Sequence, residues 1–252
     1  MQWTDQGILL STRKYGENSA IARIFTQEHG VHAGVIKSIH SKAKRGLLQT
    51  GNGVSVNWQA RLSEQLGIFS CELMHPNAAL LMDRPQALSA LTSSCALLEI
   101  SLPERHPYKM LYQQFEQLLQ AMSHDEHWLV DYIHFELQLL AETGFGLDLS
   151  ECAATGVSEN LVYISPKSGR AVSQAAGQPY HDKMLPLPAF LREKTPKNQV
   201  NRAEILAGLM VTGYFLRAWL MEAQGKSLPT ARARFVYSLE EAHGKQTAKT
   251  TI

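Results

Sequence analysis

The stretch Val54-Ser-Val-Asn-Trp-Gln-Ala-Arg61 decides the fold of the first part of this chain. Apolar residues alternate there with polar or charged ones, which is the pattern of a strand with one buried and one solvated face. The same two-residue period continues in four further segments: Ile8–Arg13, Ser19–Thr26, Gly30–Ile39 and Phe69–Leu73. No helix-length segment separates them, so we expect five short strands within residues 1–74.

Five short antiparallel strands are typical of a small closed or partly closed barrel, because closure removes the unpaired edges of an open sheet. The OB-fold is the nucleic-acid-binding barrel of this size, and an SH3-like barrel with a similar strand count remains the alternative. On the third strand we expect Val31, Ala33, Val35, Lys37 and Ile39 to share one face.

The stretch from Gly30 to Arg45 runs from that strand into a basic loop with Lys42, Lys44 and Arg45. Such a loop is too basic to be core. Taken alone, a short basic run is also typical of an ordinary solvated loop. Its function therefore depends on what surrounds it.

Beyond His75-Pro76 the period becomes helical, and we place a domain border near residue 80. The expected organisation is α+β and multidomain, with a barrel over residues 1–80 and an all-α helical bundle over residues 81–244. Capping boxes are expected at Ser123 with Glu126 and at Asn201 with Glu204. An irregular insert, rich in Gly and Pro, covers about residues 145–192, and residues 245–252 read as a disordered tail.

The net charge of +1 conceals an uneven distribution. Residues 1–80 carry eight Lys or Arg against five Asp or Glu, residues 81–180 carry five against twelve, and residues 181–252 carry eleven against six. A polyanion would contact the two basic ends and avoid the acidic centre, although chance unevenness gives the same numbers. No charge-free apolar run approaches the about 20 residues that span a bilayer, and three widely spaced cysteines fit a reducing compartment. We expect a cytoplasmic protein.

The sequence contains no Walker or Rossmann glycine loop, no GxSxG and no HExxH motif. The histidines are scattered, and paired carboxylates such as Glu240-Glu241 have no apolar setting that would shift a pKa. We therefore expect a binding protein and no catalysis. Basic residues of the barrel and of the last helix are the candidate DNA contacts, because phosphate binding needs cations at a surface. They are Arg13, Lys14, Arg23, Lys37, Lys42, Lys44, Arg45, Arg61, Arg232 and Arg234.

Two blocks of the sequence resemble the RecO family of DNA repair proteins. The first is Trp3-Thr-Asp-Gln-Gly-Ile-Leu-Leu10 with Arg13-Lys-Tyr-Gly-Glu-Asn-Ser19, followed by Ile24-Phe-Thr26 and Gly30. The second is Phe215-Leu216 in a central helix with Leu228-Pro-Thr-Ala-Arg232. The similarity extends over nearly the whole chain.

The resemblance implies an N-terminal OB-fold, a helical domain and a role as recombination mediator in the RecF pathway. Such a protein binds single- and double-stranded DNA, anneals complementary strands, and helps to load RecA onto DNA coated by SSB, with RecR as partner. It also implies a site for the acidic and apolar C-terminal tail of SSB. An apolar cleft with a cation at its edge would suit that tail, and we expect Arg217 with Trp219 to form it, with Arg202 as the alternative. A protein-interaction scaffold with incidental basic loops is the competing interpretation.

Many members of the family hold zinc with two CxxC pairs, and Cys152 stands where the first pair begins. Thr155 takes the place of its second cysteine, and Val172 and Ala175 replace the other two by an approximate match. One thiol does not make a four-ligand site, so we expect no zinc and no other cofactor. The insert would then be held by apolar packing of Tyr163, Leu185, Leu187 and Phe190.

Overall fold

The structure, a computed structural model, describes residues 1–62, 64–193 and 195–250, except for the side chains of residues 42–43 and 242–250. Its contacts divide the chain into two compact units. The barrel unit comprises Met1–His124 and Pro229–Ser238, and the helical unit comprises Asp125–Leu228 and the chain from Leu239 onward. These contacts group the helices that directly follow the strands with the barrel, whereas the expected domain border lies near residue 80.

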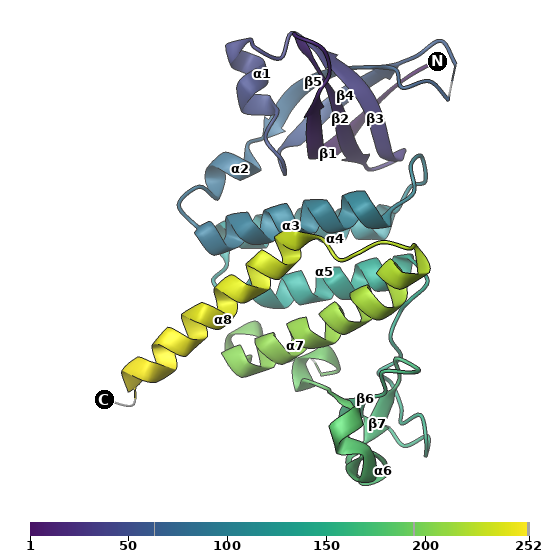
Figure 1. Ribbon diagram of the computed structural model, residues 1–252, viewed down its shortest axis with the longest axis vertical. Coiled ribbons are helices and arrows are strands. Elements are labelled where there is room, and N and C mark those ends of the chain that lie inside the picture. Colours follow the sequence, from purple (N-terminus) through teal and green to yellow (C-terminus); the bar gives the residue numbers. More distant parts are fainter. Residues whose placement is uncertain (63, 194, 251–252) are drawn as a thin grey trace. The chain divides into compact units, whose positions relative to one another are not determined.

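The five expected strands are present and close into a barrel (Figure 1). They are β1 (Gln2–Lys14), β2 (Ser19–Thr26), β3 (Gly30–Lys37), β4 (Gly53–Gln59) and β5 (Ile68–His75). Their order around the barrel is β1-β2-β3-β5-β4, with every neighbouring pair antiparallel except β3 and β5. This order, with a helix between β3 and β4, is that of an OB-fold, so the SH3-like alternative is wrong.

The barrel encloses a compact apolar core. Its buried members are Leu9, Ala22, Ile24, Ile36, Leu47, Val54, Val56, Trp58, Phe69 and Cys71. Ile36 belongs to this core, which means that the even-numbered residues of β3 point inward. Val31, Ala33, Val35 and Lys37 share one face of β3, as expected, and it is the outer face of the barrel. Gly34 also lies on the inner face, where an added Cβ would come within 2.5 Å of the Phe69 ring.

Part of the outer barrel face is buried as well. Ile8, Leu10, Phe25 and Val31 are at most 2 % exposed although they point away from the barrel interior, and the ring of Phe25 lies 5.4 Å from that of Tyr112. Burial on both faces hides the two-residue period, which is why β1 reads as a run of three apolar residues. The helices of this unit are α2 (Asn77–Leu80), α3 (Pro85–Ser101) and α4 (Lys109–His124).

The basic segment after β3 is a short helix and not the expected loop. Helix α1 spans Lys42–Leu47, and the Ser41 side chain accepts a hydrogen bond from the Lys44 amide at its N-terminus. A serine before a basic run is a helix start signal that the charge pattern obscured. Leu47 at its C-terminal end packs into the barrel core.

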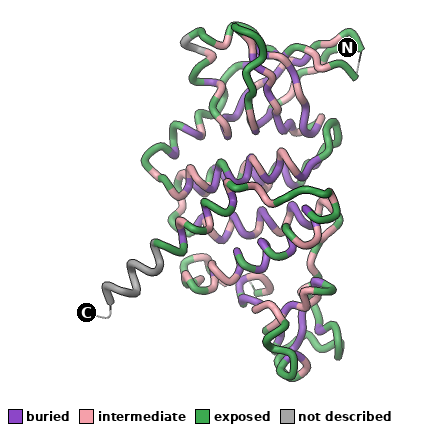
Figure 2. Tube along the Cα trace, in the orientation of Figure 1, coloured by how far each residue is buried: buried purple, intermediate pink, exposed green. Residues whose placement is uncertain are grey.

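The helical unit is built on α5 (Leu129–Glu142) and α7 (Arg202–Phe215). These helices pack closely at Gly208, where an added Cβ would come within 2.9 Å of Ile133, and the Thr212 hydroxyl donates to the buried carboxylate of Glu136 over 2.5 Å. Figure 2 shows the buried residues as stripes along these helices. A π-helical turn, η4 (Leu216–Met221), continues α7, and α8 (Thr230–Thr250) follows.

Of the two expected capping boxes, one is present. The Asn201 side chain accepts from the Glu204 amide, and the Glu204 carboxylate accepts from the Asn201 amide. The box expected at Ser123 is wrong, because Ser123 lies in the last turn of α4 and its hydroxyl donates to the Leu119 carbonyl. Helix α5 begins six residues later, after Trp128, without a side-chain cap.

The insert contains a small three-stranded sheet in the order β7-β6-β8. Its elements are β6 (Leu161–Ile164), β7 (Ala171–Ser173), α6 (Gln174–Gly177), η1 (Gln178–Lys183), β8 (Leu185–Pro186) and η2 (Ala189–Leu191), followed by η3 (Lys197–Gln199). Leu187 and Phe190 are buried, and Gly177 lies against the Tyr163 ring, as the expectation of apolar packing requires. Only β6 was evident as a strand in the sequence.

One helical stretch, Arg202–Met221, has the length and the mean hydropathy, 1.2, that a membrane span would need. It includes Arg202, Glu204 and Arg217, and 56 % of it is buried inside the fold, as in the central helix of a globular unit. The expected disordered tail, residues 245–252, lies outside the residues whose side chains are described.

Candidate nucleic-acid-binding surface

A row of residues crosses four neighbouring strands on the outer face of the barrel. Arg13 in β1 pairs with Ile21 in β2, Ile21 pairs with Val35 in β3, and Val35 pairs with Ile68 in β5. The row faces outward because the next residue of β2, Ala22, belongs to the core. With about 4.8 Å between strands, the row is about 14 Å long. We call these four residues the strand row.

Cations lie at the Arg13 end of the strand row and along one side of it. Arg13 and Lys14 are exposed at the end of β1, and Lys37 is exposed at the end of β3, where it pairs with Ser19 of β2. Lys37 is two residues beyond Val35, so it lies on the same outer face, beside the row. Tyr15, which is 54 % exposed, follows directly in the β1–β2 turn. The part of the barrel where β1 and β3 end therefore offers positive charge and an accessible aromatic ring.

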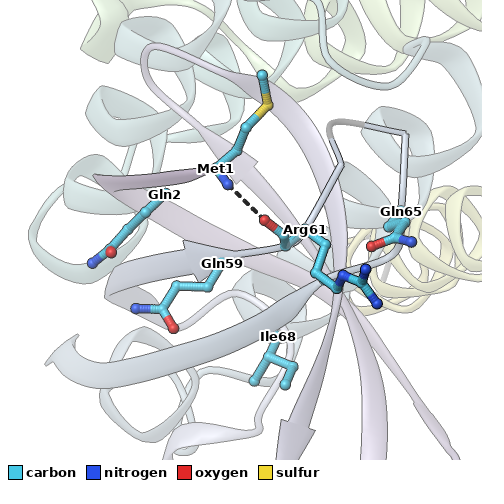
Figure 3. Close-up of a pocket in the computed structure, with 8 residues that line it drawn as sticks. Met1, Gln2, Gln59, Arg61, Gln65 and Ile68 are labelled. Carbon is cyan, nitrogen blue, oxygen red and sulfur yellow. Dashed lines mark hydrogen bonds between the residues drawn. The ribbon is translucent and has the colours of Figure 1, made fainter.

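At the other end of the row, the β4–β5 loop borders an open cavity of about 650 Å³. Figure 3 shows the side chains of Gln2, Gln59, Arg61 and Gln65 around it, with Ile68 at its edge. Amide groups can donate and accept hydrogen bonds, while the exposed guanidinium of Arg61 supplies charge. The cavity is thus polar, wide and open to solvent, unlike an enclosed pocket for an apolar ligand.

Arg105 adds a cation to this end that the sequence did not single out. It lies in the connection between α3 and α4, where its amide donates to the Val31 carbonyl over 2.9 Å, and its guanidinium Nη2 donates to the Gln65 carbonyl over 3.4 Å. Its φ of +63° is rare for a residue with a long side chain. Because Arg105 belongs to an acidic stretch far from the strands, only the fold brings it to the β4–β5 loop.

Arg23 is not available in the way the sequence suggested. Its guanidinium forms ion pairs with Glu99 at 3.7 Å and with Glu104 at 3.5 Å, and its side chain is 29 % exposed. A cation shared between two carboxylates is already neutralised, so Arg23 is removed from the candidate DNA contacts. Its partners lie in α3 and the turn after it, which the strand pattern cannot reveal.

The cations of α1 are partly engaged within the protein. The Lys44 ammonium donates to the Cys71 carbonyl over 2.8 Å, and the Arg45 Nε donates to the His40 carbonyl over 3.1 Å. Arg45 remains exposed and Lys44 is half-buried. The side chain of Lys42 lies outside the described residues. Of these two cations of helix α1, Arg45 is therefore more accessible to a ligand at the surface than Lys44.

The large aromatic residues of the barrel are mostly core. Trp58 and Phe69 are buried, and the Trp58 indole nitrogen donates to the Leu66 carbonyl over 3.2 Å. Trp3 stacks on His29 with ring centroids 4.1 Å apart and on Trp58 at 5.7 Å. Tyr15 and Ile68, in contrast, are exposed, so their side chains are accessible to a ligand at the barrel surface.

The last helix contributes one surface cation of the two expected. Arg234 is exposed, but Arg232 is only 4 % exposed. A guanidinium buried to this extent cannot reach a phosphate without rearrangement of the helix, so the inclusion of Arg232 is corrected. The i, i+2 spacing of the two residues places them on different sides of a helix.

In the helical unit, a cleft of about 130 Å³ has apolar walls and cations at its border. Its apolar lining is Leu129, Val130, Val200 and Ile205, and its polar lining is Arg202, Lys197, His127 and the acidic Glu126. The Lys197 ammonium is bound by the carboxylates of Asp125 and Asp131, at 3.3 and 2.6 Å, and is thereby neutralised. One Arg202 nitrogen, Nη2, donates to the Leu239 carbonyl over 2.5 Å. Its Nε is buried without a hydrogen-bond partner among the described residues.

Arg217 and Trp219 do not line this cleft. Both belong to the π-helical turn η4, from which Arg217 is exposed. Trp219 is half-buried against Phe215, with ring centroids 4.6 Å apart, and against Gly169. An apolar cleft with a cation at its edge is thus present at Arg202, the alternative, and the assignment of the SSB tail to Arg202 or to Arg217 stays a prediction.

Cys152 lies among groups that bind its sulfur without a metal. Its Sγ accepts from the Ser173 amide over 3.2 Å and lies 3.5 Å from the Ser173 hydroxyl. Burial raises the pKa of the thiol, but hydrogen bonds from Ser173 and Thr155 outweigh burial and lower the pKa to about 6. Within the described part of the chain, no three His, Cys, Asp or Glu side chains gather as metal ligands would. The absence of zinc stays a prediction.

Comparison with known proteins agrees with this architecture. Residues 1–76 match the family described as Recombination protein O N terminal, and residues 82–229 match Recombination protein O C terminal. The protein named DNA repair protein RecO from Rhodospirillum centenum is 43 % identical over 245 residues, which is 96 % of each chain. Its counterpart from Ruegeria is 42 % identical over 240 residues, 95 % of this chain and 98 % of that protein. The chain therefore belongs to the RecO family of DNA repair proteins.

Proposed function

We propose that the chain binds single-stranded DNA across the strand row. Phosphates would contact Arg13 and Lys14 at one end of the row, Lys37 beside it, and Arg61 and Arg105 at the other end. The observation that carries this proposal is the outward row of Ile21, Val35 and Ile68 between two groups of exposed cations. Apolar side chains support bases, while the flanking cations neutralise the backbone.

The proposed activity is strand annealing without catalysis. The cations contact phosphates, which carry no sequence information, so all sequences should bind alike. They also screen the repulsion between two strands, and a flat row about 14 Å long leaves base edges free to pair. Duplex DNA would bind through the same cations. The protein would act in the cytoplasm, at the nucleoid.

Family membership adds the proposed partners. The chain would cooperate with RecR and help to load RecA onto DNA that SSB covers. The tail of SSB would enter the cleft at Arg202, because its apolar residues fit between Leu129 and Ile205 and its acidic groups pair with the guanidinium.

Electrophoretic shift with single-stranded DNA at low and moderate salt tests the DNA proposal against the protein-scaffold alternative. We expect retention that weakens steeply with salt, together with faster annealing of complementary oligonucleotides. Absence of a shift at low salt would favour the scaffold. Reversing the charges of Lys42, Lys44 and Arg45 together should lower affinity for every sequence, but less than changes at Arg13 and Lys37, because Lys44 and Arg45 already bond within the protein.

Titration of a labelled SSB tail peptide tests the cleft. Replacing Arg202 with Gln removes the guanidinium and should lower the affinity for the peptide by about tenfold, which corresponds to the loss of a charged hydrogen bond. The matched change Arg217→Gln removes the same charge from the exposed turn and should have no effect. The reverse ranking would move the site to Arg217 and Trp219.

A further inference from the structure

A second cavity of the barrel unit lies where α4 meets the middle of β1, the start of β4 and the end of β5, apart from the strand row. Its volume is about 190 Å³. The inner part is formed by Ile8, Val54 and Tyr112, which are each at most 2 % exposed, whereas Met74 and Leu80 are 41 % and 58 % exposed and so lie at its entrance. We call it the Glu116 cavity, after the acidic residue in its lining.

Glu116 supplies the negative charge of this cavity. Its carboxyl is half-buried, and none of the ion pairs among the described residues includes it. Burial raises the pKa of Glu116, while a hydrogen bond with the Tyr112 hydroxyl and the nearby His75 lower it in part. A carboxylate removed from water gains most when a cation replaces the lost hydration.

The lining favours a cation over an anion. Among the residues that the structure describes, no Lys or Arg lines the cavity, and its basic side chains are those of His75 and His124. Gln6, Gln120 and Ser123 add oxygen atoms that can accept hydrogen bonds. A DNA phosphate or an acidic peptide would meet the Glu116 carboxylate without a compensating strong cation. The occupant is therefore a different class of ligand from those proposed for the strand row and for the Arg202 cleft.

The volume of the cavity limits the occupant to a small group. Sites for cofactors and drug-sized molecules have volumes of about 300 to 1,000 Å³, well above that of the Glu116 cavity. One long side chain is of the right order. A guanidinium suits the carboxylate best, since its planar fork donates two parallel hydrogen bonds to it and its aliphatic stem packs on apolar walls.

The entrance indicates that the cation belongs to a protein. Met74 and Leu80 lie in water there, next in sequence to the exposed Leu73 and Met82. A free small cation would leave these side chains solvated, whereas a protein segment would cover them and gain from their burial. We propose that the Glu116 cavity receives an arginine side chain of a partner protein, whose apolar neighbours cover Met74 and Leu80.

Methyl NMR of the full chain labelled with 13C-methyl methionine tests this proposal, because the Met74 methyl group reports from the entrance. The probe is a capped peptide with one arginine between leucines, at pH 8. We expect a saturable shift of the Met74 signal, which the Met74→Leu variant identifies. The same peptide with citrulline, which replaces the guanidinium by a neutral urea, should bind about tenfold more weakly or not at all.

Two variants separate the cavity from general charge effects. Glu116→Gln keeps the side-chain volume and should lower the affinity for the arginine peptide by about tenfold. Glu72→Gln removes the same charge from an exposed position on β5 outside the cavity and should leave binding unchanged. Both variants should bind single-stranded DNA like the parent chain, which keeps failure here distinct from failure of the proposed function.

Three results would overturn the proposal. The first is no change of the Met74 signal at millimolar arginine peptide. The second is equal binding of the citrulline peptide, a comparison on the unmodified chain that stands even if Glu116→Gln fails to fold. The third is equally tight binding of agmatine, a free guanidinium compound, since the apolar entrance would then contribute nothing and the cavity would be a small-cation site.

Discussion

Replacing Arg13 and Lys37 with glutamine in one variant tests the strand row through the salt dependence of DNA binding. Five exposed cations of the barrel unit are the proposed phosphate contacts: Arg13, Lys14, Lys37, Arg61 and Arg105. Each phosphate neutralised on a single strand contributes about 0.7 to the slope of log K against log salt. Contact by all five would give a slope of about −3.5, and the double variant a slope of about −2.1.

The same relation gives the expected loss of affinity. At about 0.2 M monovalent salt, each contact contributes about threefold to the binding constant through counterion release, so the double variant should bind about tenfold more weakly. The difference should shrink as salt increases, because the release of each counterion into a more concentrated salt solution gains less free energy. Fluorescence anisotropy of a labelled oligothymidine, titrated at several NaCl concentrations, measures both quantities.

The matched control is the double change Lys167→Gln and Lys183→Gln, two exposed lysines of the insert in the helical unit. It lowers the net charge by the same amount and leaves the strand row intact, so its slope should equal that of the parent chain. An unchanged slope in the Arg13 and Lys37 variant, or an equal reduction in the control, would refute the assignment of phosphate contacts to the row.

Three further predictions concern stability and metal content. Gly34→Ala should lower the free energy of unfolding by about 1–3 kcal/mol in urea denaturation, because its Cβ meets Phe69; Gly46→Ala, with nothing within 4 Å, should not. Burial and the nearby Arg105 lower the pKa of His32 in the folded barrel, so the neutral ring favours the folded state. The contribution of His32 to the free energy of unfolding should be fully present above the ordinary pKa of about 6.5, and it should decline as pH falls from there towards the folded-state pKa. A smaller loss of unfolding free energy with falling pH in the His32→Phe variant would support this assignment, and an identical loss would contradict it. Elemental analysis of purified protein should find well below one zinc ion per chain, and a stoichiometric amount would contradict the prediction that Cys152 takes part in no zinc site.

The strands were predictable because their period survives wherever one face is wet. β4 shows this best, since Val54, Val56 and Trp58 enter the core while their neighbours stay solvated. The inner face of β3 was not predictable in the same way. Val31 and Val35 look like core residues, yet the inner positions hold His32 and Gly34, and Gly34 is required because Phe69 fills the space. The residues of the inner face are determined by packing against Phe69, a contact between distant residues that the periodicity of one strand does not reveal.

The candidate site was predictable only in part, for a related reason. Basic residues on the strands, such as Arg13 and Lys37, could be named from the sequence because strand ends face solvent. Whether a cation is free depends on neighbours distant in sequence, and so Arg23 was included although Glu99 and Glu104 neutralise it. Arg105 was omitted for the converse reason, since a turn between two helices brings it to the β4–β5 loop.

The parallel contact between β3 and β5 also has a consequence for folding kinetics. β1, β2 and β3 form from successive turns, and β4 and β5 form one hairpin, so these pairings close short loops quickly. The pairing of Val35 with Ile68 joins residues separated by the whole of α1 and β4, and β1 pairs with β4 over an even longer separation. These late closures complete the strand row. A nascent barrel would carry the cations of β1 and β3 before Ile68 is in place, and its ability to hold DNA would appear only in the last step of folding.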